Sequence, residues 1–160
     1  MPFATDDPIF VDESSKLTSP VLFLSMALFA LSLCNSCFCT QNGCRTSAEA
    51  FFLGWLAMMA DGAASAWLAN PLLILAWVLL ARNKKAAWIP ALGALLLCIL
   101  FLKFHVIIED EAGHYNPILK IRIGYWLWLS SVALVFLGSL TIRILRYTRT
   151  HNSAGEDTLL

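Results

Sequence analysis

The sequence predicts an all-α membrane protein with about four transmembrane helices and a short interfacial or half-inserted helix before the second of them. Its composition is the first indication, because 59% of the residues are hydrophobic and only 14% are charged, whereas soluble proteins have about 45–50% and about 25%. Residues 20–39 and 123–142 contain no charged side chain, and about 20 apolar residues suffice for a helix to cross the bilayer. Acidic and basic residues number 11 each, so the basic surplus typical of nucleic-acid partners is missing. The lipid bilayer is the expected partner, and we set nucleic acid aside.

Residues 1–19 are expected to form a flexible cytoplasmic tail, because acidic residues, Ser, Thr and Pro dominate this segment. The first span is expected at residues 20–39. A cleaved signal peptide is the alternative interpretation of this span, but the region before it is acidic, whereas signal peptides begin with positive charge. We therefore expect the first span to be retained.

The second span depends on where residues 48–81 break. This apolar stretch would measure roughly 50 Å as a single helix, which is too long for one span and too short for two spans with a turn. Two breaks are visible in it: Asp61 followed by Gly62, and Asn70 followed by Pro71. Glycine is flexible, and proline removes a backbone donor and restricts the residue before it.

With the break at Gly62, residues 49–60 are expected to form a helix at the membrane interface or partly inserted. Residues 62–81 then form the second span, kinked near Pro71. Asp61 would stand at a helix start, where a carboxylate caps exposed backbone amides. If residues 49–60 crossed the bilayer instead, the chain would have five spans.

Residues 87–108 and 123–142 are expected to form the third and fourth spans. Lys103 lies near the end of the third span, where its long side chain can reach the headgroups. Residues 143–160 are expected to form a cytoplasmic tail that is first basic and then polar.

Both termini are expected in the cytoplasm, because short cytoplasmic segments are enriched in Lys and Arg. In this orientation the cytoplasmic ends of the spans carry seven basic residues: Lys16, Arg82, Lys84, Lys85, Arg143, Arg146 and Arg149. The opposite ends carry four: Arg45, Lys103, Lys120 and Arg122. We therefore expect a multi-pass membrane protein in this orientation. The C-terminal arginines are interpreted as an ordinary positive flank, with attraction of anionic lipid as the alternative.

Four of the five cysteines gather at the outer end of the first span and in the first outer loop: Cys34, Cys37, Cys39 and Cys44. Cys34 and Cys37 have the C-x-x-C spacing of redox pairs, in which one thiolate attacks and its neighbour resolves the mixed disulfide. This pair and the predicted architecture resemble the disulfide-bond-forming membrane oxidases, which pass electrons from thiols to quinones. Those oxidases need a second cysteine pair, and residues 109–122 contain no cysteine.

Two other interpretations of the cysteines stay open. One is a structural disulfide that joins Cys44 to Cys37 or to Cys39. The other is that the cysteines are unpaired and pack as small hydrophobic side chains. The latter is the expected role of Cys98, which lies alone in the third span.

His105 and Glu109 are four residues apart and would lie one above the other on a helix, with His114 a little beyond. Such side chains are able to ligate a metal. Three of them near a membrane face arise easily by chance, so we expect them to interact with each other or with water. The sequence predicts neither a metal nor a cofactor.

Five residues are candidates for a kink or a close helix contact: Gly62, Ala66, Asn70, Pro71 and Gly138. A helix broken inside the second span could bind an ion or substrate, but transporters usually carry a matching break in a repeated half, and this sequence has no internal repeat. A kink satisfied by neighbouring helices is the simpler interpretation. The small residues would allow close contact with another span or with a partner.

Three short segments carry a further resemblance: Gly54-Trp55-Leu56, residues 66–73 (AWLANPLL) and residues 124–129 (GYWLWL). They resemble a pattern in small bacterial integral membrane proteins with four helices. The resemblance implies a bacterial origin and a four-helix membrane fold, and it implies no activity.

The leading functional hypothesis is a non-catalytic accessory or interaction protein that packs against a membrane partner or against itself. An immunity or exclusion protein is a specialised form of this hypothesis. The alternative from the enzyme class is a thiol-disulfide oxidoreductase that uses Cys34 and Cys37. A third hypothesis is a subunit of an oligomeric pore or transporter.

Overall fold

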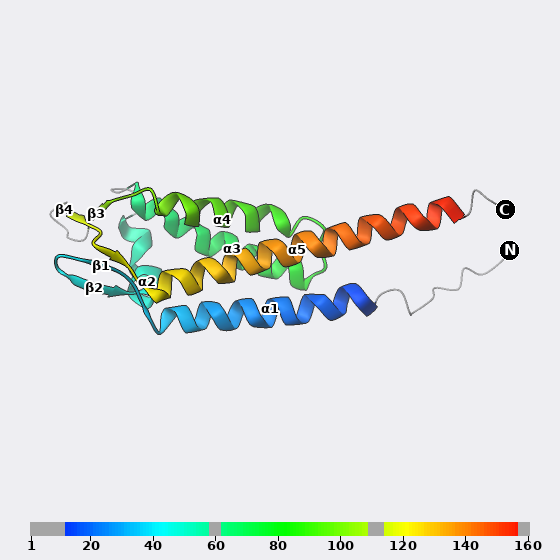
Figure 1. The fold of residues 1–160 in the computed structure, drawn as a ribbon, viewed down its shortest axis with the longest axis horizontal. Helices are drawn as coiled ribbons and strands as arrows, with labels where there is room; N and C mark the ends of the chain where they lie inside the picture. Colours follow the sequence, from blue (N-terminus) through cyan, green and yellow to red (C-terminus); the bar gives the residue numbers. More distant parts are fainter. Residues whose placement is uncertain (1–11, 58–61, 109–113, 157–160) are drawn as a thin grey trace.

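The structure, a computed structural model, describes residues 12–57, 62–108 and 114–156. The expectations for Asp61 and Glu109 lie outside these ranges. Four helices lie side by side in an elongated bundle, with a small sheet at one end and the first and last described residues at the other (Figure 1). The chain is therefore mostly helical as expected, and the sheet corrects the prediction of an all-α fold.

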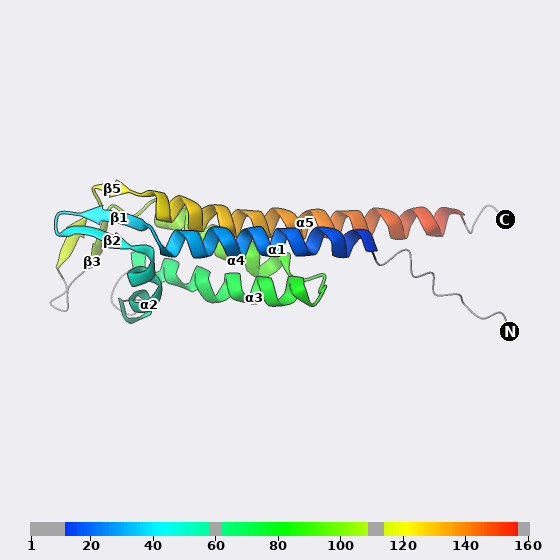
Figure 2. The ribbon, with the colours of Figure 1, turned by 90° about the horizontal axis from the view of Figure 1, so that it is seen from below.

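The bundle consists of α1 (Asp12–Leu33), α3 (Ala69–Ala81), α4 (Trp88–Phe101) and α5 (Ile123–Glu156). Successive bundle helices run in opposite directions, and α1 lies beside α5 in both views (Figures 1 and 2). Within the described ranges, three helical stretches are long and apolar enough to cross a membrane: Lys16–Leu33, Ala63–Ala81 and Ile123–Thr148. α4 is apolar but shorter. α5 continues beyond residue 142, where the fourth span was expected to end. α1 begins at Asp12, so residues 12–19 are helical and do not form part of a flexible tail as expected.

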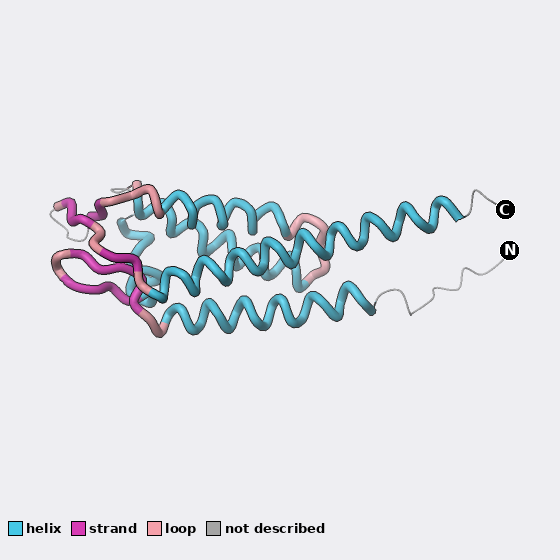
Figure 3. The backbone as a smooth tube through the Cα atoms, viewed as in Figure 1, coloured by secondary structure: helices cyan, strands magenta, loops and turns pink. Residues whose placement is uncertain are grey.

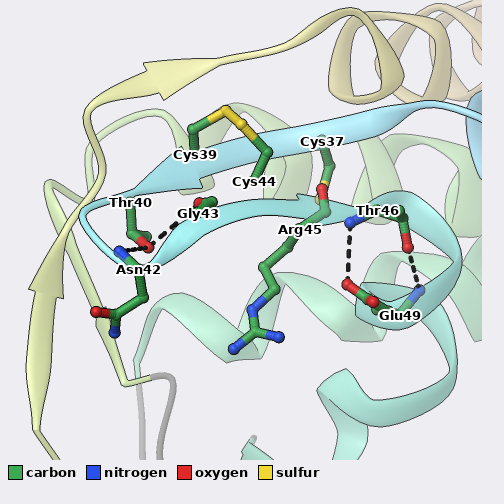
Figure 4. The surroundings of a disulfide bond; sticks show 9 residues. All are labelled: Cys37, Cys39, Thr40, Asn42, Gly43, Cys44, Arg45, Thr46 and Glu49. Atoms are coloured by element: carbon green, nitrogen blue, oxygen red, sulfur yellow. Dashed lines mark hydrogen bonds between the residues drawn. A yellow bond between two sulfur atoms is a disulfide. The ribbon is translucent and has the colours of Figure 1, made fainter.

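A separate short helix, α2 (Ser47–Ala57), precedes the second span, close to where an interfacial helix is expected. It begins at a reciprocal cap (Figure 4). The Thr46 amide donates to Glu49 Oε2 at 3.1 Å, and the Glu49 amide donates to Thr46 Oγ1 at 3.2 Å. This T-x-x-E arrangement is a capping box, which satisfies two backbone donors at the helix start.

The chain enters the bundle through a 3₁₀ helix, η2 (Ala63–Leu68), which continues directly into α3. The change of helix type falls just before Pro71, so this proline occupies the first turn of α3, where its missing amide costs least. Asn70 Oδ1 accepts a hydrogen bond from Trp128 Nε1 at 3.0 Å. The kink expected inside the second span is thus a change of helix geometry, fixed by a contact with α5.

Two small antiparallel sheets lie at the end of the bundle opposite the first and last described residues (Figure 3). One has the strand order β2-β1-β5, and the other pairs β3 with β4. The strands are β1 (Ser36–Thr40), β2 (Gly43–Thr46), β3 (Val106–Ile108), β4 (Tyr115–Pro117) and β5 (Lys120–Ile121). Gly43 follows the β1–β2 turn with φ 128, a conformation that favours glycine.

The strands correct two expected span ends. The first span, expected to continue to residue 39, ends as a helix at Leu33, because β1 pairs with β2 on one side and with the distant β5 on the other. The third span, expected to continue to residue 108, ends as a helix at Phe101, because β3 pairs with β4. These pairings satisfy backbone groups between separate segments, so the hydropathy of either segment alone does not reveal them.

Reciprocal hydrogen bonds fasten α1 to α5 inside the bundle. Ser25 Oγ donates to the Ser131 carbonyl at 3.0 Å, and Ser131 Oγ donates to the Ser25 carbonyl at 2.9 Å. Trp77 Nε1 of α3 donates to Ser25 Oγ at 2.9 Å. Both serines are fully buried. Because buried polar groups without partners are costly, these bonds favour one arrangement of the three helices.

Small residues allow the same helices to approach closely. Gly138 of α5 faces Val21 of α1, and a β-carbon at Gly138 would lie 2.6 Å from Val21 Cγ1. That separation is too short for any real contact. The absence of a side chain at this position therefore sets how close α1 and α5 lie.

The variant Gly138→Ala should be less stable than the natural chain, because overpacking of this kind costs about 1–3 kcal/mol. Gly93→Ala is the matched control, since its new β-carbon would meet only Leu72 Cδ1, at 3.2 Å, the far end of a flexible side chain. Thermal unfolding in detergent should give a lower Tm for the first variant and little change for the second. Equal Tm values would contradict the close contact of α1 with α5.

Candidate functional site

A disulfide closes the β1–β2 hairpin. Cys39 lies directly opposite Cys44 in the strand register, and their sulfur atoms are bonded. Figure 4 shows the disulfide on one side of the hairpin and the Arg45 side chain on the other. Of the two partners that the sequence left open for Cys44, the register selects Cys39 and leaves Cys37 free.

The C-x-x-C pair joins two cysteines in unlike surroundings. Cys34 follows the end of α1 and is exposed, whereas Cys37 is buried in β1, and both are free. Cys37 Sγ donates to the Arg45 carbonyl at 3.3 Å, and burial raises the pKa of this thiol to about 11. Such a thiol stays protonated near neutral pH and is a poor nucleophile. The oxidoreductase hypothesis stays a prediction that this geometry does not favour.

A cavity of about 290 Å³ lies beside the hairpin, between α1, α2, η2, β1 and α5. Its aromatic side chains are Phe29, Phe38, Phe51, Trp67, Phe101, Tyr125 and Trp128. Among the described residues that line it, only Arg45 and Glu49 are charged. An apolar recess with a few polar groups is the usual form of a pocket for a small molecule or a partner's side chain.

The two tryptophans of the cavity wall use their polar atoms in structural bonds. Trp67 Nε1 donates to the Phe51 carbonyl at 2.7 Å, which ties η2 to α2. Trp128 Nε1 donates to Asn70 Oδ1, which ties α5 to α3. Because these donors are already used, a ligand in this cavity would be recognised mainly by its shape and apolar surface.

Of the three candidate metal ligands, the structure describes His105 and His114, and these two lie apart. The residues that follow His105 form β3 (Val106–Ile108) and not the helix on which the expected ligand spacing depended. His105 directly precedes β3 and His114 directly precedes β4. Because these strands are antiparallel, the two histidines lie at opposite ends of the strand pair, about 13 Å apart along it. Among the described residues, no group of three His, Cys, Asp or Glu side chains is able to hold a metal ion.

The helix-packing candidates fall into two groups. Ala66 and Asn70 are buried in the bundle, and Gly138 packs against α1. Gly62 and Pro71 are exposed near the start of η2 and α3. The buried members of this set therefore serve contacts within the chain and are not available to a partner.

Sequence reasoning missed two features that shape this end of the molecule. The capping box of Thr46 and Glu49 has a recognisable signal, T-x-x-E before an apolar run. The pairing of Phe38 with Ile121 has no comparable signal, because partners so far apart in the chain leave no local pattern.

The fold is thus that of a small bundle of apolar helices with a disulfide-bonded sheet at one end. No protein-family model matches the chain, and no curated protein or solved structure matches it. The proposals for this protein therefore rest on its own residues and their geometry.

Alkylation should distinguish the five cysteines. In denaturant without reductant three should react, and reduction should release two more, because Cys39 and Cys44 are disulfide-bonded. In the folded variant Cys34→Ser/Cys98→Ser, Cys37 should react slowly with iodoacetamide at pH 7. Its rate should rise about tenfold per pH unit up to its raised pKa, because the thiolate is the reactive form. Peptide mass spectrometry measures these rates, and fast reaction of Cys37 at pH 7 would favour the redox hypothesis again.

Proposed function

We propose that the chain crosses a bacterial inner membrane four times, with both termini in the cytoplasm. The alternating helices bring the first and last described residues to one end of the bundle (Figure 1). Seven basic residues near span ends belong to that end in sequence and four to the sheet end, which agrees with the enrichment of cytoplasmic segments in Lys and Arg. The disulfide at the sheet end suits an oxidising compartment outside the cytoplasm.

The short α4 is compatible with a fourth crossing. Trp88–Phe101 would measure about 21 Å as a helix. A bilayer accommodates a short apolar helix by local thinning, and flanking Lys side chains extend toward the headgroups. Lys103, just beyond the end of α4, is exposed and placed for this role.

Thiol labelling tests this orientation. A membrane-impermeant maleimide should label Cys34 on intact spheroplasts, because this residue is exposed near the sheet end. In a Cys34→Ser background, Lys84→Cys should react only after the membrane is permeabilised, since Lys84 lies in the loop at the opposite end. Labelling of Lys84→Cys on intact spheroplasts would place the termini outside and contradict the proposal.

Within this topology we infer that the protein acts by binding a membrane partner and not by catalysis. The observation that carries this inference is the exposed surface of α2, a helix that lies outside the four-helix bundle (Figure 2). Its large apolar side chains Phe52, Leu53, Trp55 and Leu56 are all more than half exposed, at 66%, 59%, 53% and 60%. We call these four residues the α2 surface.

The α2 surface adjoins the apolar cavity, because Leu53 and other residues of the same helix line that cavity. Exposed aromatic side chains next to an apolar recess are typical of the anchors that dominate protein interfaces. The small residues Ala66 and Gly138 already pack against other parts of the same chain. The contacts within the chain leave the α2 surface exposed outside the bundle (Figure 2), and a transmembrane helix of another protein or of a second copy fits it.

Photo-crosslinking tests the α2 surface. A photoreactive phenylalanine analogue at Trp55 should give a discrete protein adduct in membranes. The same analogue at Ile89 of α4 is the control, since Ile89 is exposed to a similar degree, 55% against 53%, and should crosslink to lipid alone. Adducts with lipid alone at both positions would contradict partner binding through α2.

A further inference from the structure

A second cavity, of about 320 Å³, is lined by residues of the α3–α4 loop and of α5. This loop lies at the end of the bundle away from the strands (Figure 1). Its lining includes Asn83, Lys84, Lys85, Arg143, Arg146 and Tyr147. Four of these side chains are basic, and none of the described residues that line the cavity is acidic. Positive charge from a loop and a helix is thus concentrated in one recess.

The two arginines are held by contacts with neighbouring elements. Arg146 Nη1 donates to the Asn83 carbonyl at 3.0 Å and Nη2 donates to Asn83 Oδ1 at 3.1 Å, which fixes the loop against α5. Asn83 has a left-handed backbone, with φ 53, a conformation that Asn adopts more readily than most residues. The Arg143 guanidinium carbon lies 4.7 Å from the ring centre of Trp88, within cation–π range. The recess is therefore ordered before any ligand binds.

The cavity combines its basic side chains with apolar ones. Leu80, Ala87 and Ile142 supply the apolar part of the lining. The loop that forms one wall lies between the end of α3 at Ala81 and the start of α4 at Trp88, where the apolar part of the bundle ends. A ligand with an anionic head and an apolar chain matches both kinds of lining.

We propose that this cavity binds the phosphate group of an anionic phospholipid of the cytoplasmic leaflet. Arg and Lys side chains form strong charge-assisted hydrogen bonds with phosphate oxygens. Basic pockets between transmembrane helices on the cytoplasmic side suit such headgroups. The proposal rests on the four-span orientation proposed above and is independent of partner binding by the α2 surface.

Native mass spectrometry of the full chain, released from nanodiscs of equal phosphatidylcholine and phosphatidylglycerol, tests the proposal. The natural chain should retain phosphatidylglycerol in preference to phosphatidylcholine. Lys84→Gln/Lys85→Gln should weaken this retention by about fivefold or more. Lys120→Gln/Arg122→Gln is the matched control, because it removes the same charge at the sheet end and should leave retention unchanged. The four side chains changed in the two variants are exposed, so both double variants should fold.

The second variant, Lys84→Glu/Lys85→Glu, reverses the charge of the two lysines. It should abolish the preference for phosphatidylglycerol, because carboxylates repel the lipid phosphate. Equal retention of the two lipids by the natural chain, or equal weakening in both glutamine variants, would overturn the proposal. Displacement of the bound lipid by an excess of inorganic phosphate would assign the cavity to a soluble phosphate compound and overturn the lipid assignment. Labelling of Cys34 and of Lys84→Cys reports the orientation separately, so a failure of the topology is distinguishable from the lack of a lipid site.

Discussion

The pair of hydrogen bonds exchanged by Ser25 and Ser131 is the contact on which the arrangement of the helices depends. In an apolar interior, water is not present to satisfy a hydroxyl group, and here each serine bonds to the other serine on the facing helix. Trp77 adds a third helix to the same point. Because Gly138 has no side chain to separate α1 from α5, the two backbones are close enough for these bonds to form.

The contact between α1 and α5 also determines what happens at the sheet end. β1 follows α1, and β5 directly precedes α5, so docking the two helices brings these strands together. The β1–β2 hairpin and its disulfide then stand over the end of the bundle, and α2 starts from the capping box that follows β2. The cavity next to α2 is the space left between these elements. The position of this cavity therefore depends on the contact between α1 and α5, although that contact lies elsewhere in the bundle.

At the opposite end the same arrangement gathers basic residues that are remote in sequence. Lys84 and Lys85 lie in the α3–α4 loop, whereas Arg143 and Arg146 lie on α5. In the sequence, the two lysines follow the second span and the two arginines follow the fourth span, so a count of basic residues treats them as two separate groups. The two hydrogen bonds from Arg146 to Asn83 join these groups into one recess, which is the site that we propose for an anionic lipid.

The sequence by itself determined the helical, apolar character of the chain. Uncharged length predicted the helices now seen as α1 and α5, and the charged and flexible residues near Gly62 indicated that a separate short helix precedes the second span. These features depend on local composition and helix chemistry, which a single segment contains. For the cysteine cluster, the sequence left three interpretations open, and one of them was a structural disulfide such as one that joins Cys44 to Cys37 or to Cys39.

Only the tertiary structure decided the features that depend on contacts between distant segments. The strand register chose Cys39 over Cys37 as the partner of Cys44, buried Cys37, and ended two helices earlier than apolar length predicted. The structure also separated His105 from His114 and turned Gly138 toward α1. The physical reason is common to all of these. Backbone hydrogen bonds and close packing each involve two chain segments. The sequence of one segment alone does not show which other segment it will contact.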